Sequence, residues 1–266
     1  NIFGAGEKNI ENNFSTFLYT GDTSAADDSQ SLTTGINLAG KGGLLWIACR
    51  SAARGHTLVD TAQNKYISSA SAAAGATSHD ITLTSTGFTL GNGDAAYNNG
   101  TTPDTYCAWT FKQAPKFFDV VKYNGTGSTQ NISHNLGVVP AMIMVKGFDS
   151  QSDSVRWNVF HKDASPNGTP QNGRMALNTT DAYNEHPTVS VFQGLWNNTA
   201  PTDSVFTVGS YGDTNGSGQE FIAYLFAHND GDGEFGPDSD ADIIKCGTYT
   251  GNGALGNAIN LGFEPQ

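Results

Sequence analysis

One stretch of this chain occurs more than once, and it opens with Val120-Val121-Lys122-Tyr123-Asn124-Gly125. This opening recurs downstream as Ile243-Ile244-Lys245-Cys246-Gly247-Thr248-Tyr249-Thr250-Gly251, and its continuation Leu136-Gly137-Val138-Val139-Pro140 recurs as Leu261-Gly262-Phe263-Glu264-Pro265. A looser copy stands upstream at Phe17-Leu18-Tyr19-Thr20-Gly21. Self-similarity along a sequence is typical of repeated structural units. We therefore expect an internal repeat, which favours a structural or adhesive protein over an enzyme.

Short apolar or alternating runs follow the repeated stretch at regular spacing, and turn-forming residues separate them. The runs are too short for helices and carry the period of strands. They predict an all-β fold built of tandem antiparallel β-sandwich repeats, of the jelly-roll or lectin-like type. The runs are 44–49, 56–60, 65–68, 81–84, 87–91 and 106–111 in the first unit, and 157–161, 174–178, 205–209 and 221–226 in the second.

The repeat also sets the expected domain boundaries. Residues 1–16 are expected to form an arm or linker, 17–118 the first sandwich, 119–241 the second, and 242–266 the start of a third repeat or a C-terminal docking strand. Because a lone strand and turn cannot bury an apolar face, we expect 243–263 to pack on the second unit or on a neighbouring chain.

Composition excludes several classes of partner. The net charge is −12 and only 14% of residues are charged, so nucleic acid and anionic membranes are poor partners, because phosphate binding needs clustered Lys and Arg. No run reaches the 18 apolar residues of a membrane span. The three cysteines have no metal-site or disulfide spacing, and we interpret them as buried apolar residues. The chain begins at Asn1, which indicates processing or a longer parent polypeptide.

An acidic stretch at 230–242 is the main candidate metal site. It holds six carboxylates spaced by Gly and Ser, and Ca²⁺ takes six to eight oxygens from a flexible loop. The candidate ligands are Asp230, Asp232, Asp238 and Asp240, although the spacing is not that of an EF-hand. The alternative is a solvated acidic connector between units, with no bound cofactor.

The sequence gives little support for catalysis. It has no nucleophile elbow in a strand-to-helix setting, and its six histidines lack the spacing of a metal site. Its acidic residues lie almost entirely in the predicted loops, and Asp119 and Asp242 recur at the junctions between units. We therefore expect a protein that is not an enzyme.

Aromatic residues in polar loops give a candidate glycan contact. Trp196 stands among Gly, Asn and Thr, and with Tyr183 and Tyr211 it is a candidate sugar-stacking face. The alternative is that Trp196 plugs the end of the sandwich. Trp46, Trp109 and Trp157 lie in apolar runs and are expected in the core.

Several long segments resemble a known group of proteins. Segments 108–121, 131–140, 196–209 and 223–233, which include Ala223-Tyr224-Leu225-Phe226-Ala227-His228-Asn229-Asp230, are similar to the repeat modules of virion structural and tail-fibre-like proteins of marine bacteriophages. The resemblance implies a lectin-like β-sandwich on the surface of a virion, and it carries over no catalytic residues.

The resemblance also implies the partners. They would be other virion proteins and a host surface glycan. We also expect further copies of the same chain, because the third unit is incomplete and the surface is rich in Gly and Asn, with a trimer first by analogy with phage fibres. Loops around 23–30, 92–104, 182–200 and 210–219 would face outward for host-surface contact. A capsid decoration or cementing protein and a glycan-binding module are the alternatives, and a polysaccharide depolymerase is the least favoured.

Overall fold

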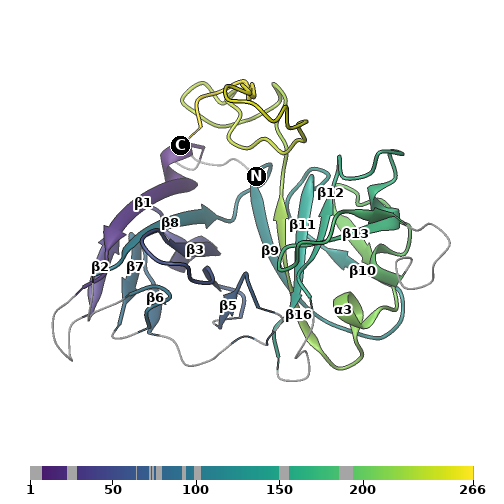
Figure 1. Ribbon diagram of the computed structural model, residues 1–266, viewed down its shortest axis with the longest axis horizontal. Helices are drawn as coiled ribbons and strands as arrows, with labels where there is room; N and C mark the ends of the chain where they lie inside the picture. Colours follow the sequence, from purple (N-terminus) through teal and green to yellow (C-terminus); the bar gives the residue numbers. More distant parts are fainter. Residues whose placement is uncertain are drawn as a thin grey trace.

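The computed structural model describes residues 8–22, 29–63, 65–71, 73, 75, 80–91, 94–98, 103–149, 156–185 and 194–265. Within these residues the strands form four antiparallel sheets, and the helical turns have only three or four residues each. The predicted all-β class is therefore confirmed. Figure 1 shows two halves side by side, each consistent with a β-sandwich that pairs a large sheet with a small one. No helix of the described residues is long and apolar enough to cross a membrane.

The first half places its core between a five-stranded and a three-stranded sheet. Inward-facing side chains such as Leu45, Phe88 and Tyr106 are almost fully buried there, because alternate residues of each strand point to the same face. The large sheet has the order β1 (Phe14–Thr20), β8 (Thr105–Lys112), β3 (Gly43–Cys49), β4 (Thr57–Asp60) and β5 (Tyr66–Ser68), and the small sheet has the order β2 (Gln30–Thr33), β7 (Gly87–Leu90) and β6 (Ile81–Leu83). Two helical turns accompany these sheets, η1 (Ile10–Asn12) and α1 (Leu38–Lys41).

The second half repeats this layering with a six-stranded and a two-stranded sheet. Its core contains Val145, Phe206 and Leu225 among other buried apolar residues. The large sheet has the order β14 (Asn184–Glu185), β13 (Gly173–Ala176), β12 (Asn158–His161), β11 (Met142–Gly147), β16 (Glu220–Phe226) and β9 (Phe118–Asn124), and the small sheet pairs β10 (Gln130–Ser133) with β15 (Val205–Val208). Its helical turns are η3 (Pro170–Asn172) and α3 (Gly212–Asn215).

The two halves share their strand order, and one tyrosine occupies the same place in both. β1-β8-β3-β4-β5 corresponds to β9-β16-β11-β12-β13. Tyr19 of β1 stacks on Tyr106 of β8 at 5.0 Å between ring centroids, and Tyr123 of β9 stacks on Phe221 of β16 at 5.3 Å. Both interplanar angles are 15°. These likenesses agree with the predicted repeat, which itself stays a prediction.

A third apolar cluster joins the two halves, and we call it the seam. It combines residues from the large sheet of the first half, such as Leu44 and Leu58, with residues from the large sheet of the second, such as Met144. Polar contacts cross it as well, because the Trp157 indole Nε1 donates to the Ser68 carbonyl at 2.9 Å. The large sheets of the two sandwiches are therefore packed on each other, and the halves are not beads on a flexible linker.

The structure differs from two expectations on the first half. β1 begins at Phe14, three residues before the expected start of the first sandwich at residue 17, because the Phe14 ring packs on Phe111 at 5.0 Å and draws this segment into the sheet. Trp46 and Trp109 are only half-buried, whereas they were expected in the core; Trp157 is fully buried as expected. The two strands that contain these tryptophans, β3 and β8, are placed as predicted, but part of the face that they share stays open.

Candidate functional site: the acidic loop and the C-terminal segment

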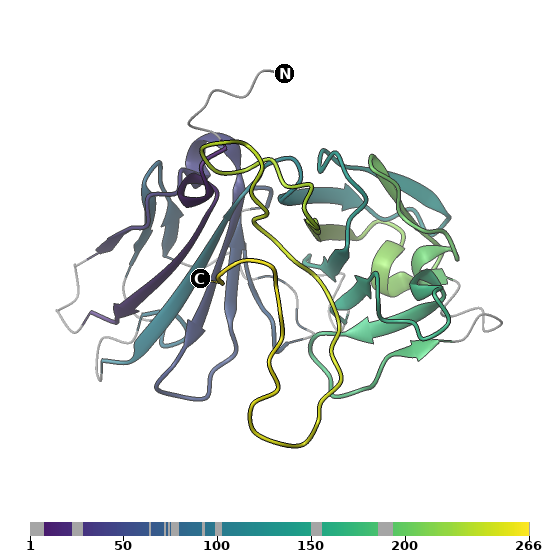
Figure 2. The same cartoon turned by 90° about the horizontal axis from the view of Figure 1, so that it is seen from above.

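The C-terminal segment, residues 243–265, leaves the second sandwich and crosses to the first (Figures 1 and 2). It is fastened at its start by Asn229, which is 1% exposed. The Asn229 side-chain oxygen accepts from the backbone N–H groups of Ile243 and Ile244 at 3.1 and 3.3 Å, and the backbone N–H of Asn229 donates to the Ile244 carbonyl at 2.8 Å. Residues 243–246 pack on the seam, which both halves share, whereas the expectation was packing of 243–263 on the second unit or on a neighbouring chain.

The remainder of the C-terminal segment is mostly exposed. Tyr249 is 70% exposed, whereas Tyr19 and Tyr123, its counterparts in the repeated stretch, are 7% and 8% exposed. Leu255 and Ile259 are also exposed, and the segment forms no strand. Residues 247–260 thus carry strand-like sequence that has no sheet to join within the described chain.

An apolar groove of about 340 Å³ lies where the C-terminal segment meets the first sandwich. Ile10, Phe14 and Phe111 line one side, and Ile243, Leu261 and Phe263 line the other, together with other residues of the same segments. The segment itself forms one wall, so this groove is part of how the segment packs.

The acidic loop, residues 230–242, is held by lysines from three parts of the chain. Lys245 Nζ lies 2.5 Å from Asp230, and Glu234 pairs with Lys116 at 2.8 Å and with Lys8 at 3.3 Å. The bond to Lys245 lowers the pKa of Asp230, and the bonds to Lys116 and then Lys8 lower the pKa of Glu234. The loop therefore connects the N-terminal segment, the junction between the halves and the C-terminal segment.

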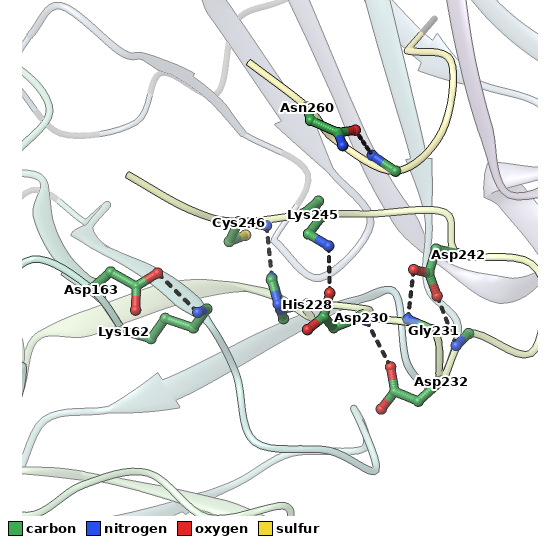
Figure 3. A network of polar contacts seen from close by, with 12 residues as sticks. Lys162, Asp163, His228, Asp230, Gly231, Asp232, Asp242, Lys245, Cys246 and Asn260 are labelled. Carbon is green, nitrogen blue, oxygen red and sulfur yellow. Dashed lines mark hydrogen bonds and ion pairs between the residues drawn. The ribbon is translucent and has the colours of Figure 1, made fainter. Parts of the chain in front are cut away.

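The four candidate calcium ligands do not converge. Asp232 accepts from the backbone N–H of Asp230 at 3.0 Å, while Asp238 and Asp240 are exposed further along the loop. Asp242, which was not among the candidates, accepts from the N–H groups of Gly231 and Gly233, both at 2.9 Å (Figure 3). Across the described residues, no group of three or more His, Cys, Asp or Glu side chains is placed to hold a metal ion.

Cys246 and His228 are neighbours at the start of the C-terminal segment (Figure 3). The imidazole Nδ1 accepts from the Cys246 backbone N–H at 3.1 Å, and the thiol lies 3.4 Å from the Ala227 carbonyl as a donor. Burial raises the pKa of this thiol to about 11. A nucleophilic cysteine needs a lowered pKa. Because the pKa of Cys246 is raised instead, we interpret the contacts of Cys246 and His228 as structural.

The three candidate glycan-contact residues do not form one exposed face. Trp196 is 2% exposed and packs edge-on against Phe160 in the core of the second sandwich. Tyr211 is half-buried against the same core, and the Tyr183 hydroxyl donates to the Pro170 carbonyl beside η3. For Trp196 the structure agrees with the alternative of a plug, because its ring is buried within the second core, where its large apolar area contributes to packing.

One of the predicted outward loops packs inward. Within 210–219, α3 carries the buried residues Thr214 and Asn215. The Asn215 amide joins four groups: its oxygen accepts from Thr126 N and Gln130 Nε2, and its nitrogen donates to the Ser128 and Gly209 carbonyls. Of the other predicted display loops, 23–28, 92–93, 99–102 and 186–193 lie outside the described residues.

Sequence reasoning missed the two asparagines that organise these regions, Asn215 and Asn229. Both stand in Gly- and Asn-rich stretches that are typical of turns, so composition alone marks them as exposed. Their burial depends on the segments that return to them from elsewhere in the chain.

The described residues form an all-β protein with sandwich layering, in which two sandwiches pack on each other through their large sheets. Residues 10–266 match the model of a family described as a domain of unknown function, DUF7483, and the chain belongs to that family. Neither the comparison with curated proteins nor the comparison with solved structures gave a match.

Proposed function

We propose that this protein is a non-enzymatic structural component of a bacteriophage particle surface, of the tail-fibre or adhesin type, that contacts the host. The observation that carries the proposal is the seam. It packs the two sandwiches against each other through an apolar interface in which Trp157 and Tyr224 are fully buried. Two sandwiches packed in this way keep their outer surfaces in a fixed relative position, which is suitable for a structural protein that other proteins pack against. The sequence resemblance to phage structural repeats supports the same assignment.

The exposed part of the C-terminal segment supports assembly with other chains. Single exposed apolar side chains are common, but Tyr249, Leu255 and Ile259 lie within 11 positions of one strandless segment. The counterparts of Tyr249 in the two sandwiches, Tyr19 and Tyr123, lie in the strands β1 and β9. We therefore include homo-oligomers, with a trimer first, and other virion proteins among the partners of the proposal.

A glycan-binding module is the second candidate, because tryptophan side chains stay partly open on one sheet, as argued in the next subsection. The proposal assigns no bound cofactor. Calcium binding at Asp230 and Asp232 would require the ion pair between Asp230 and Lys245 to break. A capsid decoration protein is a further alternative that the fold does not distinguish from a fibre protein. The position of the protein on the particle distinguishes these two functions.

Localisation on particles tests the proposal directly. An antibody raised against the purified protein should label phage particles released from cells that express the gene, and electron microscopy should place the label on the outer surface. Label confined to the soluble fraction of the cells, with bare particles, would overturn it. Light scattering of the purified chain measures the oligomer, and Leu255→Ser should lower the assembled fraction while Ala254→Ser, its exposed neighbour, should not.

A further inference from the structure

The large sheet of the first half has an outer face that is only partly covered by the seam. Directly opposed residues of an antiparallel pair share a face, so β1, β8 and β3 present one row as Thr16, Trp109 and Trp46. The next row toward the N-terminal end of β8 is Leu18, Cys107 and Ala48. The row on the other side, Phe14, Phe111 and Leu44, belongs to the seam or packs against it.

The middle row contains two half-buried indole rings. Trp46 and Trp109 lie with centroids 6.4 Å apart and planes at 87°, so one ring meets the other edge-on. Trp46 packs partly against the seam, and Leu18 in the neighbouring row is 58% exposed. Cys107 and Ala48 in that row are only 8% and 6% exposed, so the open part of this apolar face consists of Leu18 and the accessible parts of the two indole rings.

His56 lies beside both tryptophans and adds a polar group whose protonated ring nitrogen can be inferred from its hydrogen bond. Its ring lies 6.1 Å from Trp46 and 6.4 Å from Trp109 between centroids, and its Nδ1 accepts from the Trp46 indole N–H at 2.9 Å. Burial lowers the pKa of His56, which favours the neutral ring. Because Nδ1 accepts, the proton of the neutral ring lies on Nε2, which is then a hydrogen-bond donor. Arg50, which is exposed and directly follows the last residue of β3, adds a cationic group at that end of the strand.

The second sandwich shows that this opening is specific to the first. The positions of Trp109 and Trp46 correspond to Tyr224 and Met144, which are cross-strand partners on β16 and β11. Tyr224 is 0% exposed and Met144 is 2% exposed, because both lie in the seam. The same sheet position is thus core in one half and surface in the other.

We propose that Trp46, Trp109 and His56 form a carbohydrate-binding platform on the outer face of the first sandwich. The C–H groups of a sugar ring carry partial positive charge and meet the negative face of an indole, while adjacent donors bind hydroxyl oxygens. The platform takes a neutral hexose-based oligosaccharide, stacked on Trp109 and hydrogen-bonded by His56 Nε2. This inference rests on the proposed host-contact function, and it moves the glycan contact from Trp196 to the other sandwich.

The test is a titration of the purified full chain with neutral hexasaccharides of glucose (α-1,4 and β-1,4) and of N-acetylglucosamine, followed by intrinsic tryptophan fluorescence. At least one of these should change the emission, and Trp109→Ala should weaken that binding by about tenfold or more, as expected for the loss of one stacked ring. Trp196→Phe is the matched control, because it changes a buried indole in the other sandwich and should leave binding unchanged. Far-ultraviolet circular dichroism checks that each variant is folded.

A second measurement needs no variant. N-bromosuccinimide oxidises accessible indoles, so Trp46 and Trp109 should react before the buried Trp157 and Trp196, and the bound oligosaccharide should protect the first pair. The proposal fails if none of the oligosaccharides changes the fluorescence, or if Trp109→Ala binds like the wild type. It also fails if Trp109→Ala only dissociates an oligomer, because the face is then a contact between protein chains. Particle labelling is independent of all these results, so the proposed virion role is judged separately.

Discussion

The Tyr224 hydroxyl donates a 2.7 Å hydrogen bond to Oδ2 of Asp60, although the two residues are 164 positions apart and belong to different sandwiches. Both are buried. Asp60 also accepts from Gln63 Nε2 and from the backbone N–H groups of Ala62 and Gln63. A buried carboxylate is tolerated because these donors surround it, so the seam is held by polar groups as well as by apolar area.

Removal of the Tyr224 hydroxyl should destabilise the whole chain. Tyr224→Phe keeps the ring but leaves Asp60 one donor short in a buried site, which should cost about 1–3 kcal/mol in the free energy of unfolding. Urea denaturation followed by circular dichroism measures the loss. Tyr249→Phe is the matched control, since that ring is 70% exposed, and it should change nothing. Equal stabilities of the two variants would show that the hydrogen bond is not significant.

The stability should also depend on pH through Asp60. Burial raises the pKa of this carboxyl above its ordinary value of 3.8, and the hydrogen bonds from Tyr224 and Gln63 oppose that rise. The folded chain then holds the proton more tightly than the unfolded chain. The contribution to stability is therefore complete below the ordinary value and is lost as the pH rises through the raised pKa.

Asp60→Asn removes this titration. The unfolding free energy of the variant should fall less than that of the wild type as the pH rises above about 4, where an unperturbed aspartate is already ionised. Urea denaturation at several pH values gives both curves. Parallel curves would contradict the assignment of the titrating group to Asp60.

Asn215 should be among the most sensitive polar positions. Its side chain makes four hydrogen bonds between 2.6 and 2.8 Å, and Asn215→Ala leaves their partners unsatisfied near the end of the second sandwich. We expect a loss of about 2–4 kcal/mol in unfolding free energy. Asn257→Ala, at an exposed position with one hydrogen bond, should cost less than about 0.5 kcal/mol. A small effect at Asn215 would mean that water replaces the amide.

Asn229 should control how firmly the C-terminal segment is held. Asn229→Ala removes the acceptor for Ile243 N and Ile244 N, so the segment should detach more often and expose Cys246. Maleimide labelling of Cys246, followed by peptide mass spectrometry, should become about tenfold faster if the clamp is worth one full hydrogen bond of roughly 1.4 kcal/mol. Labelling of Cys107 in the first sandwich serves as the internal control. An unchanged rate at Cys246 would show that apolar packing alone fastens the segment.

Chelation should leave the melting temperature unchanged. Lys245 pairs with Asp230, and backbone N–H groups occupy Asp232 and Asp242, so the loop is already satisfied without a cation. Differential scanning calorimetry with and without EDTA makes the comparison, and added CaCl₂ completes it. A melting temperature that falls with EDTA and recovers with calcium would establish a native-state ion.

Much of the layering followed from the sequence, because alternation of apolar and polar residues is a local property. It placed β7 near Phe88 and β16 near Tyr224, and the recurrent Tyr19 and Tyr123 marked the opening strand of each sandwich. The calcium and glycan candidates were selected by composition. Composition cannot tell an exposed loop from one that folds back, as the burial of Trp196 illustrates.

The local sequence pattern was enough to predict the all-β class and the residues that share a face of a strand. The tertiary structure decided which faces meet. Trp109 and Tyr224 hold corresponding positions in similar strands, yet one is half-buried at a surface and the other is sealed in the seam beside Asp60. Alternation of apolar and polar residues depends only on neighbouring positions in a strand, so it can be recognised in the sequence. Contact between two sheets depends on the complementarity of surfaces that are assembled from distant parts of the chain.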